Sequence, residues 1–357
     1  MKEHKTYNIF LFLSTLTRNL VEVFSLVLLY KKGYTINNLM FYLFILYTTG
    51  ILANYISLKI YYKKILIISS LLYGISFIYL SNLTKGLTPL SILAILQAFG
   101  SYSYHAVRHL LALTMIKNEK RNTTNIILLN YLSIIVSSII GIYLLERLSL
   151  TITSIIIFIL SFISILPILN KPKIIIDSKF KDNKVIIPRR KIIFNILEQF
   201  KVLFLELQPL FLYIYIDNSI YYVGIFNVLT SISSLLVIYY ISKKNIVKYF
   251  KYQTLFLGLI LTLKLNIKSG IILLFIAFLE GIFVKLYERP SLSTLYDYDY
   301  DNNYIPNYLI KEEFIFFSTK SIIMFIFLIF NFNLYTIMYI NIVGIILSGL
   351  FINKKNT

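Results

Sequence analysis

Stretches of about 20 predominantly apolar residues recur along the whole chain, separated by short polar segments. A helix of roughly 20 residues crosses the ~30 Å hydrocarbon core of a membrane. The pattern predicts twelve transmembrane helices, but lysines at 264 and 268 shorten the ninth and tenth, so ten or eleven crossings remain alternatives. The predicted spans are 8–30, 38–60, 63–82, 89–116, 124–144, 150–169, 192–216, 219–241, 252–267, 270–286, 312–332 and 336–352.

The composition agrees with an all-α polytopic membrane protein. The chain has 357 residues, of which 58% are hydrophobic and 14% charged, and a mean hydropathy of +0.75. Soluble domains carry about 25% charged residues. No segment between the spans is long enough for a soluble domain of ~50 residues. The absence of cysteine excludes disulfides, thiolate metal sites and cysteine nucleophiles.

The positive charges indicate the orientation of the spans. With a cytoplasmic N-terminus, 25 of the 35 Lys and Arg residues fall in inner segments and six, Lys264 among them, in outer loops. Because inner loops are enriched in Lys and Arg, this bias predicts that both termini are cytoplasmic and that the number of crossings is even. The net charge of +19 then reflects topology and contact with anionic lipids, so no nucleic-acid partner is expected.

A basic segment over 170–191, with prolines near both ends, divides the chain into two halves of six spans. The halves are 1–169 and 192–357. A faint repeat supports this division, because Tyr55-Ile56-Ser57 ends the second span and Tyr240-Ile241-Ser242 ends the eighth. We therefore expect an N-terminal half, a cytoplasmic linker and a C-terminal half.

Ionisable residues inside the spans give the strongest functional signal. Each costs about 2.5–3.5 kcal/mol on insertion scales, so each needs a partner or a role. They concentrate in the first, fourth, seventh and tenth spans, which are equivalent positions under a six-span repeat, with one more in the eleventh. These residues are Arg18 and Glu22; His105, Arg108 and His109; Glu198, Lys201 and Glu206; Glu280; and Lys320. This distribution predicts a polar interior shared by the halves.

Each group has a functional and a structural interpretation. Arg18 and Glu22 lie four apart, and their pair either exchanges partners during transport or only neutralises itself for insertion. The two histidines and Arg108 either bind an anionic group of the substrate or relay protons. The structural interpretation is that they form a hydrated helix end. Glu206 and Glu280 are candidate proton sites, although Glu280 is also a candidate partner for Lys285 or Lys320. Glu198 and Lys201 fit an interfacial pair, and together with Lys320 they are kept as gating or structural residues.

The chain resembles the major facilitator superfamily, whose cavity is lined mainly by helices one, four, seven and ten. The loop after the second helix in that superfamily typically reads Gly-x-x-x-Asp-(Arg/Lys)-x-Gly-(Arg/Lys)-(Arg/Lys). Here Gly50 keeps its place and Asn54 takes the acidic one, followed by Tyr55, Ser57, Leu58 and Lys59 at the other motif positions. The resemblance implies two pseudo-symmetric six-helix halves. It also implies gating or structural roles for Gly50, Asn54 and Lys59.

The resemblance also implies a secondary active transporter that works by alternating access in the cytoplasmic membrane of a bacterium. The carboxylates and histidines in the spans favour protons as coupling ions, and four basic against four acidic groups favour a small polar or zwitterionic solute. A drug or peptide exporter on the same fold, or a non-transporting immunity factor, sensor or scaffold, remains the alternative. No enzyme motif or phosphate-binding loop is present. The run Asp297, Asp299 and Asp301 lacks the other positions of a calcium loop, so we expect no bound metal there. We also expect no cofactor, and we expect the protein to be a monomer.

Overall fold

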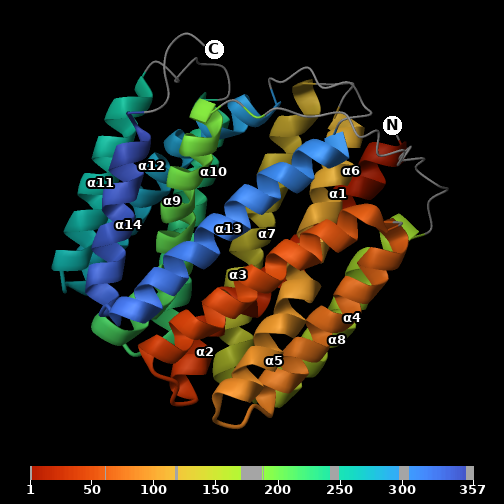
Figure 1. The fold of residues 1–357 in the computed structure, drawn as a ribbon, viewed down its shortest axis with the longest axis horizontal. Coiled ribbons are helices and arrows are strands. Elements are labelled where there is room, and N and C mark those ends of the chain that lie inside the picture. The colour runs from red at the N-terminus through yellow and green to blue at the C-terminus, as the bar shows by residue number, and fades with distance from the viewer. Residues whose placement is uncertain are drawn as a thin grey trace. The chain divides into compact units, whose positions relative to one another are not determined.

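The computed structural model describes residues 2–60, 62–116, 120–169, 187, 189–241, 249–296 and 305–350. Helices form all the regular structure in these ranges, and they fall into two compact units (Figure 1). The first unit contains α1 (Lys2–Glu22), α3 (Ile36–Lys59), α4 (Tyr62–Ser81), α5 (Leu87–Gln97), the π-helix η1 (Ala98–Tyr102), α6 (Ser103–Ile116), α7 (Lys120–Arg147), α8 (Leu150–Leu169) and α13 (Ile305–Phe330). The second contains α9 (Arg189–Tyr215), α10 (Ile220–Ile241), α11 (Phe250–Asn266), α12 (Gly270–Tyr296) and α14 (Leu334–Ser348).

Each of the twelve predicted spans corresponds to a helix or to consecutive helices in the described residues, which confirms the all-α polytopic membrane fold. Within the described part of the chain, eight segments are long and apolar enough to cross a membrane by length and composition. The first predicted span bends after Glu22, since α2 (Ser25–Lys31) begins only after a two-residue turn. The fourth predicted span is α5 followed without interruption by η1 and α6.

Packing groups the helices differently from their order along the chain. α13 belongs to the first unit, because its aromatic and polar side chains pack along α3. Phe325 contacts Phe44, and the hydroxyls of Ser321 and Thr48 lie 2.7 Å apart. In Figure 1 these two helices run side by side. The division into halves 1–169 and 192–357 remains a prediction, and most of the linker at 170–191 lies outside the described residues.

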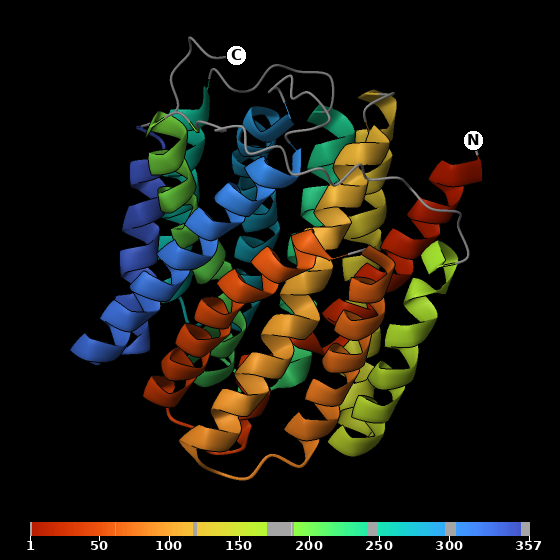
Figure 2. The ribbon, with the colours of Figure 1, turned by 45° about the vertical axis from the view of Figure 1, so that its right-hand side comes forward.

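Small residues bring the helices of the first unit close together. On the α4–α8 pair, Gly74 lies so close to Phe158 that an added Cβ would be 2.5 Å from its ring, and the Ser161 hydroxyl donates to the Ser70 carbonyl at 3.0 Å. In lipid, helices associate through such close packing and interhelical hydrogen bonds rather than through the hydrophobic effect. Figure 2 shows this antiparallel pair in orange and yellow-green.

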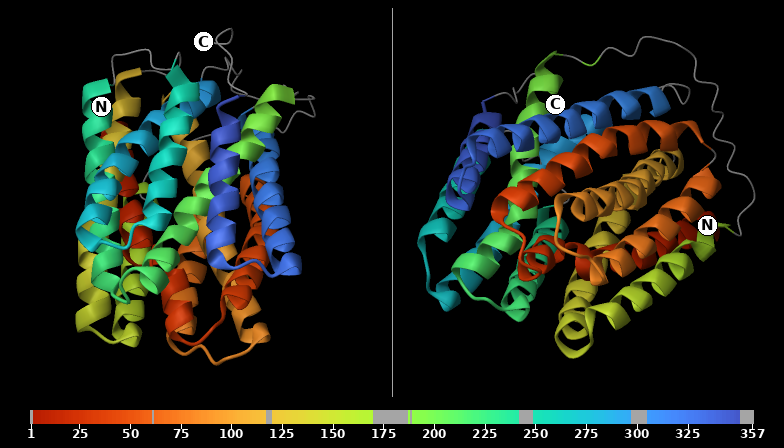
Figure 3. Two further views of the ribbon diagram at one scale, coloured as in Figure 1. Left: turned by 90° about the vertical axis from the view of Figure 1, so that its left-hand side faces the viewer. Right: turned by 60° about the horizontal axis from the view of Figure 1, so that its bottom comes forward.

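Local signals in the sequence fix where helices begin. Before α3, Gly33 adopts a φ of 86°, which glycine tolerates without strain, and Thr35 then caps the helix by accepting from the amide of Asn38. Asn333 caps α14 in the same way, through the amide of Thr336. The connection from α11 to α12, seen in teal in Figure 3, is also short, so these two helices of the second unit run antiparallel.

The contact of α10 with α12 in the second unit is closest at Gly281. A Cβ added there would lie 2.0 Å from the Ser233 hydroxyl and 2.1 Å from the Thr230 carbonyl oxygen. The backbone carbonyl of Gly281 also accepts a hydrogen bond of 2.8 Å from Ser234. The two backbones therefore leave no room for a side chain at this position.

We predict that Gly281→Ala destabilises the protein by about 1–3 kcal/mol, because the added methyl group forces the two helices apart. The matched control is Gly270→Ala on the same helix, where a Cβ would be 3.7 Å from the Tyr222 ring, an ordinary contact. Thermal unfolding of detergent-purified protein, followed by circular dichroism at 222 nm, gives both values. Equal melting temperatures for the two variants would contradict the close approach of α10 and α12.

Candidate functional site

Arg18 is a buried cation at the centre of the first unit. Its side chain is 4% exposed, and its Nη1 donates a hydrogen bond of 2.9 Å to the carbonyl of Gly100. The guanidinium carbon lies 3.8 Å from the centre of the Tyr104 ring and 4.5 Å from that of Tyr73. Two aromatic faces and one carbonyl oxygen thus provide the negative electrostatic environment for this charge.

The surroundings of Arg18 are held in place by further hydrogen bonds. The Tyr73 hydroxyl donates to the Arg18 backbone carbonyl at 2.7 Å, and the Tyr104 hydroxyl bonds to Ser14. Gly100 belongs to η1, and its backbone approaches α4 so closely that an added Cβ would lie 2.7 Å from the Tyr73 nitrogen. Such single-turn π-helices are frequent at functional sites. The site is therefore rigid, with both tyrosine rings fixed.

The predicted pairing of Arg18 with Glu22 is not present. The guanidinium faces α4 and η1, and no carboxylate of a described residue lies within ion-pair distance of it. Glu22 is exposed at the last residue of α1. The helical spacing of four residues placed both groups on one side of the helix, but the carbonyl in η1 and the two rings compete successfully for the guanidinium.

The histidine group on α6 reaches α13. His109 is half exposed, and its Nδ1 lies 4.0 Å from a carboxylate oxygen of Glu313. His105 and Arg108 are half-buried, and the ring of His105 stands edge-on to that of Tyr104 at 5.6 Å. Glu313 was not among the predicted site residues, although its charge directly after Glu312 within an apolar helix was a signal for it.

Gly50 and Asn54, which keep the frame of the superfamily motif, lie on the buried side of α3. A Cβ on Gly50 would be 2.8 Å from both the Tyr102 and Phe317 rings, so a side chain larger than hydrogen does not fit. Asn54 is buried, and neither its amide nitrogen nor its amide oxygen has a hydrogen-bond partner in the described part of the chain. Gly50 therefore allows α3 to pack closely against η1 and α13.

The two lysines predicted as gating or structural residues in this unit lie in different environments. Lys320 is buried on α13, with its ammonium 4.9 Å from the centre of the Tyr47 ring on α3. Lys59 is exposed at the end of α3, and its ammonium lies over the ring of Tyr55 one turn before it. Lys320 is thus an interior charge, whereas Lys59 is a terminal one.

The second unit contains a completely buried ion pair. The ammonium of Lys264 on α11 lies 2.8 Å from Oε2 of Glu280 on α12, and both side chains have zero exposure. The rings of Phe226 and Phe204 stand 4.4 and 5.4 Å from the same ammonium. The second carboxylate oxygen, Oε1, has no hydrogen-bond partner among the described residues.

The assignment of Lys264 to an outer loop is wrong. The lysine lies in the last turn of α11, two residues before the helix end, and faces the interior. Glu280 accordingly pairs with Lys264 rather than with Lys285 or Lys320. A charge within the run Leu259–Leu265, otherwise apolar apart from one threonine, was the available signal, but its nearness to the span boundary made a loop assignment natural.

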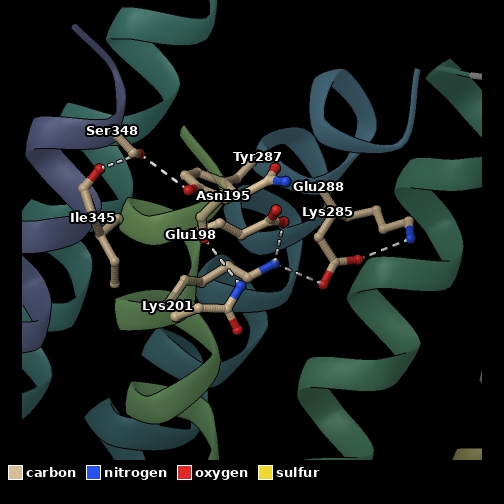
Figure 4. A network of polar contacts seen from close by, with 9 residues as sticks. Asn195, Glu198, Lys201, Lys285, Tyr287, Glu288, Ile345 and Ser348 are labelled. Atoms are coloured by element: carbon tan, nitrogen blue, oxygen red, sulfur yellow. Dashed lines mark hydrogen bonds and ion pairs between the residues drawn. The ribbon is translucent and has the colours of Figure 1, made fainter. Parts of the chain in front are cut away.

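Glu198 and Lys201 belong to a larger network of charges (Figure 4). The Lys201 ammonium lies 3.7 Å from a carboxylate oxygen of Glu198 and 3.3 Å from one of Glu288, and the other Glu288 oxygen is 3.0 Å from Lys285. Glu288 was missed by the sequence prediction, although its spacing of three from Lys285 fits a helical pair. Two lysines and two glutamates therefore balance one another between α9 and α12.

Hydroxyls and aromatic rings surround this network. The Tyr287 hydroxyl donates to Ser348 at 3.0 Å, which links α12 to α14, and the Tyr287 ring lies 5.0 Å from the Lys201 ammonium. Glu206, another predicted proton site, lies half-buried two turns further along α9 than Glu198. Its neighbour Gln208 is buried, and its side-chain oxygen has no partner in the described ranges.

Comparison with known proteins identifies the fold. No protein-family model matches the sequence, and a search of curated proteins finds no match. Solved structures do match over nearly the whole length. A point mutant of the nucleoside transporter NupG has a TM-score of 0.68 at 12% identity, covering 97% of this chain and 98% of that one. A bacterial homologue of the iron transporter ferroportin, in an outward-facing state with soaked iron, has a TM-score of 0.68 at 12% identity, with 98% of both chains covered.

The same ferroportin homologue without that soak has a TM-score of 0.63 at 11% identity, again with 98% of both chains covered. The class of protein is therefore a multi-pass α-helical membrane protein. It shares its fold with these transporter structures, in agreement with the two-half transporter fold that the resemblance in the sequence implied.

We predict that Lys264→Met and Glu280→Met each destabilise the protein by about 3–5 kcal/mol, since each leaves one buried group without its partner. The double variant Lys264→Met with Glu280→Met should recover most of this loss, because no uncompensated charge remains. Lys268→Met, at an exposed position four residues from Lys264, is the matched control. If the decrease in melting temperature of the double variant equals the sum of the decreases of the two single variants, the ion pair is contradicted.

Proposed function

We propose that the chain is a secondary active transporter that moves a small solute by alternating access, with protons as the coupling ions. The fold similarity to transporters supports this class. The observation that carries the coupling is the Lys264–Glu280 pair, because a carboxylate with zero exposure keeps one oxygen without a partner. Stability alone does not require such a pair, since well-packed apolar residues often replace a buried ion pair without loss.

A proton on Glu280 would neutralise the carboxylate and weaken its attraction to Lys264. In a low-dielectric interior, that change in the interaction is large compared with the same event in water. The pair joins α11 to α12, and Glu280 is followed by the close contact of Gly281 with α10. Protonation would therefore act on three helices of the second unit, which is how a small ion can bias a conformational equilibrium.

The solute is best described by its chemistry. One structural neighbour is named a nucleoside transporter and another a homologue of an iron transporter, and at 11–12% identity these names do not choose between solutes. No three His, Cys, Asp or Glu side chains of the described residues gather closely enough to hold a metal ion. The buried cations and polar groups of the first unit favour a small polar solute instead.

Two alternatives share the fold. A drug or peptide exporter would prefer bulky lipophilic solutes, and a non-transporting immunity factor, sensor or scaffold would need no coupled ion site. The first alternative predicts that cationic drugs move protons across the membrane, and the second that neutralising Glu280 or Arg108 changes only stability.

We predict that purified protein in sealed liposomes takes up at least one pool of polar solutes when a proton gradient is imposed. A pH dye inside the vesicles reports proton movement, and the pools are amino acids, sugars, nucleosides, organic acids and cationic drugs. Glu280→Gln should abolish proton movement, because an amide carries no titrating proton. Glu146→Gln, at an exposed position on α7, should leave it unchanged and serves as the matched control.

Silence from every pool with correctly folded protein would count against proton-coupled transport and favour the non-transporting alternative. Uptake that survives Glu280→Gln at full rate would keep the transporter and remove Glu280 from the coupling step. Responses confined to cationic drugs would favour the exporter.

A further inference from the structure

The charges in the interiors of the two units are compensated differently. In the second unit, Lys201, Lys264 and Lys285 each lie within 3.3 Å of a carboxylate oxygen. In the first unit, Arg18 is buried but has no carboxylate of a described residue within ion-pair distance. A guanidinium in this position lacks the anion that the lysines of the other unit have.

The guanidinium also has unused hydrogen-bonding capacity. Arginine carries five N–H donors, and the bond from Nη1 to Gly100 uses one. Nε and Nη2 have no acceptor within the described part of the chain, and neither nitrogen is fully enclosed by protein atoms. The guanidinium, whose residue is 4% exposed, therefore keeps donors that the described residues do not use.

From this geometry we infer that Arg18 is the receptor for an anionic group of the transported solute, a carboxylate or a phosphate. This inference rests on the proposed transport function and names its substrate class. The planar fork of a guanidinium matches both oxyanions by two parallel hydrogen bonds. The rings of Tyr73 and Tyr104 hold the guanidinium at 4.5 and 3.8 Å, so its orientation is set before the solute arrives.

The polar side chains around Arg18 suit a small solute with further hydrogen-bonding groups. Thr15 on the same helix donates to the side-chain oxygen of Asn130 on α7 at 3.0 Å, and Asn19 donates to the Thr15 carbonyl at 2.8 Å. Thr15 and Asn19 lie within one turn of Arg18 along α1. This part of the first unit thus combines a positive group with hydroxyl and amide groups, a combination that recognises an organic anion or a zwitterion.

The test measures ligand-induced thermal stabilisation of detergent-purified protein. Four probe pools are used: carboxylates including amino acids, phosphate esters with inorganic phosphate, neutral amides and alcohols with nucleosides, and organic cations. We expect one anionic pool to raise the melting temperature of the wild type, whereas the neutral and cationic pools do not. The pool that acts distinguishes a carboxylate from a phosphate.

Three variants assign the effect to Arg18. Arg18→Gln should lose the stabilisation, and Arg18→Lys should weaken the apparent affinity at least about tenfold, because a point charge replaces the bidentate fork. Arg147→Gln, at an exposed position at the end of α7, should bind like the wild type. If Arg18→Gln does not fold, Tyr104→Leu removes one ring from the guanidinium and should weaken binding in the same direction.

The inference is overturned if no anionic pool stabilises the wild type, or if Arg18→Gln binds the anion as well as the wild type does. Uptake into liposomes separates this failure from failure of the proposed function. A neutral solute transported equally by wild type and Arg18→Gln leaves the transporter and refutes the anion receptor. Anion binding that depends on Arg18 without any uptake leaves the receptor and refutes transport.

Discussion

The structure depends on how a protein compensates charges in an interior that contains little water. An ammonium or guanidinium that leaves water loses several kcal/mol of solvation, which only a close partner restores. In the second unit the partner is a carboxylate, as the 2.8 Å contact of Lys264 with Glu280 illustrates. In the first unit it is a pair of aromatic faces and a peptide carbonyl around Arg18. Each of these partners lies on a different helix from the charge that it compensates. The contacts therefore hold neighbouring helices of one unit together.

This difference gives the two units different chemical capacities. A pair such as Lys264–Glu280 is electrically complete, because each charge has an opposite charge at 2.8 Å. The Arg18 guanidinium has no carboxylate of a described residue within ion-pair distance, and this difference is the basis for proposing it as an anion receptor. Hydrogen bonds that fix Tyr73 and Tyr104 keep the guanidinium oriented without reducing its charge. A transporter that couples a proton to a solute needs both capacities, and separating them allows each to change without destroying the other.

The sequence was sufficient for the helices and for most of the charged ones, α11 excepted, because apolar length and the cost of burying ions act locally. It was not sufficient for the partners. The spacing of Arg18 and Glu22 favoured an ion pair, but the carbonyl of Gly100 becomes an acceptor through the local geometry of η1, which no spacing rule predicts. Lys264 was misplaced because two residues separate it from the end of its helix, where a loop and a buried last turn look alike in sequence. Glu313 and His109 meet only because α13 packs in the same unit as α6.

The contrast between a fold shared at 12% identity and a site with its own charges follows from the same physics. Helices that pack in lipid need sufficient apolar length and small residues where they cross, such as Gly74 and Gly281. Many different sequences meet these two requirements. A buried charge, by contrast, is retained only where something compensates it. The name of a structural neighbour therefore describes the scaffold, whereas the proposed receptor for the solute is Arg18. An arginine that the protein surrounds with rings instead of carboxylates keeps its charge available, and that availability is what an anionic solute would use.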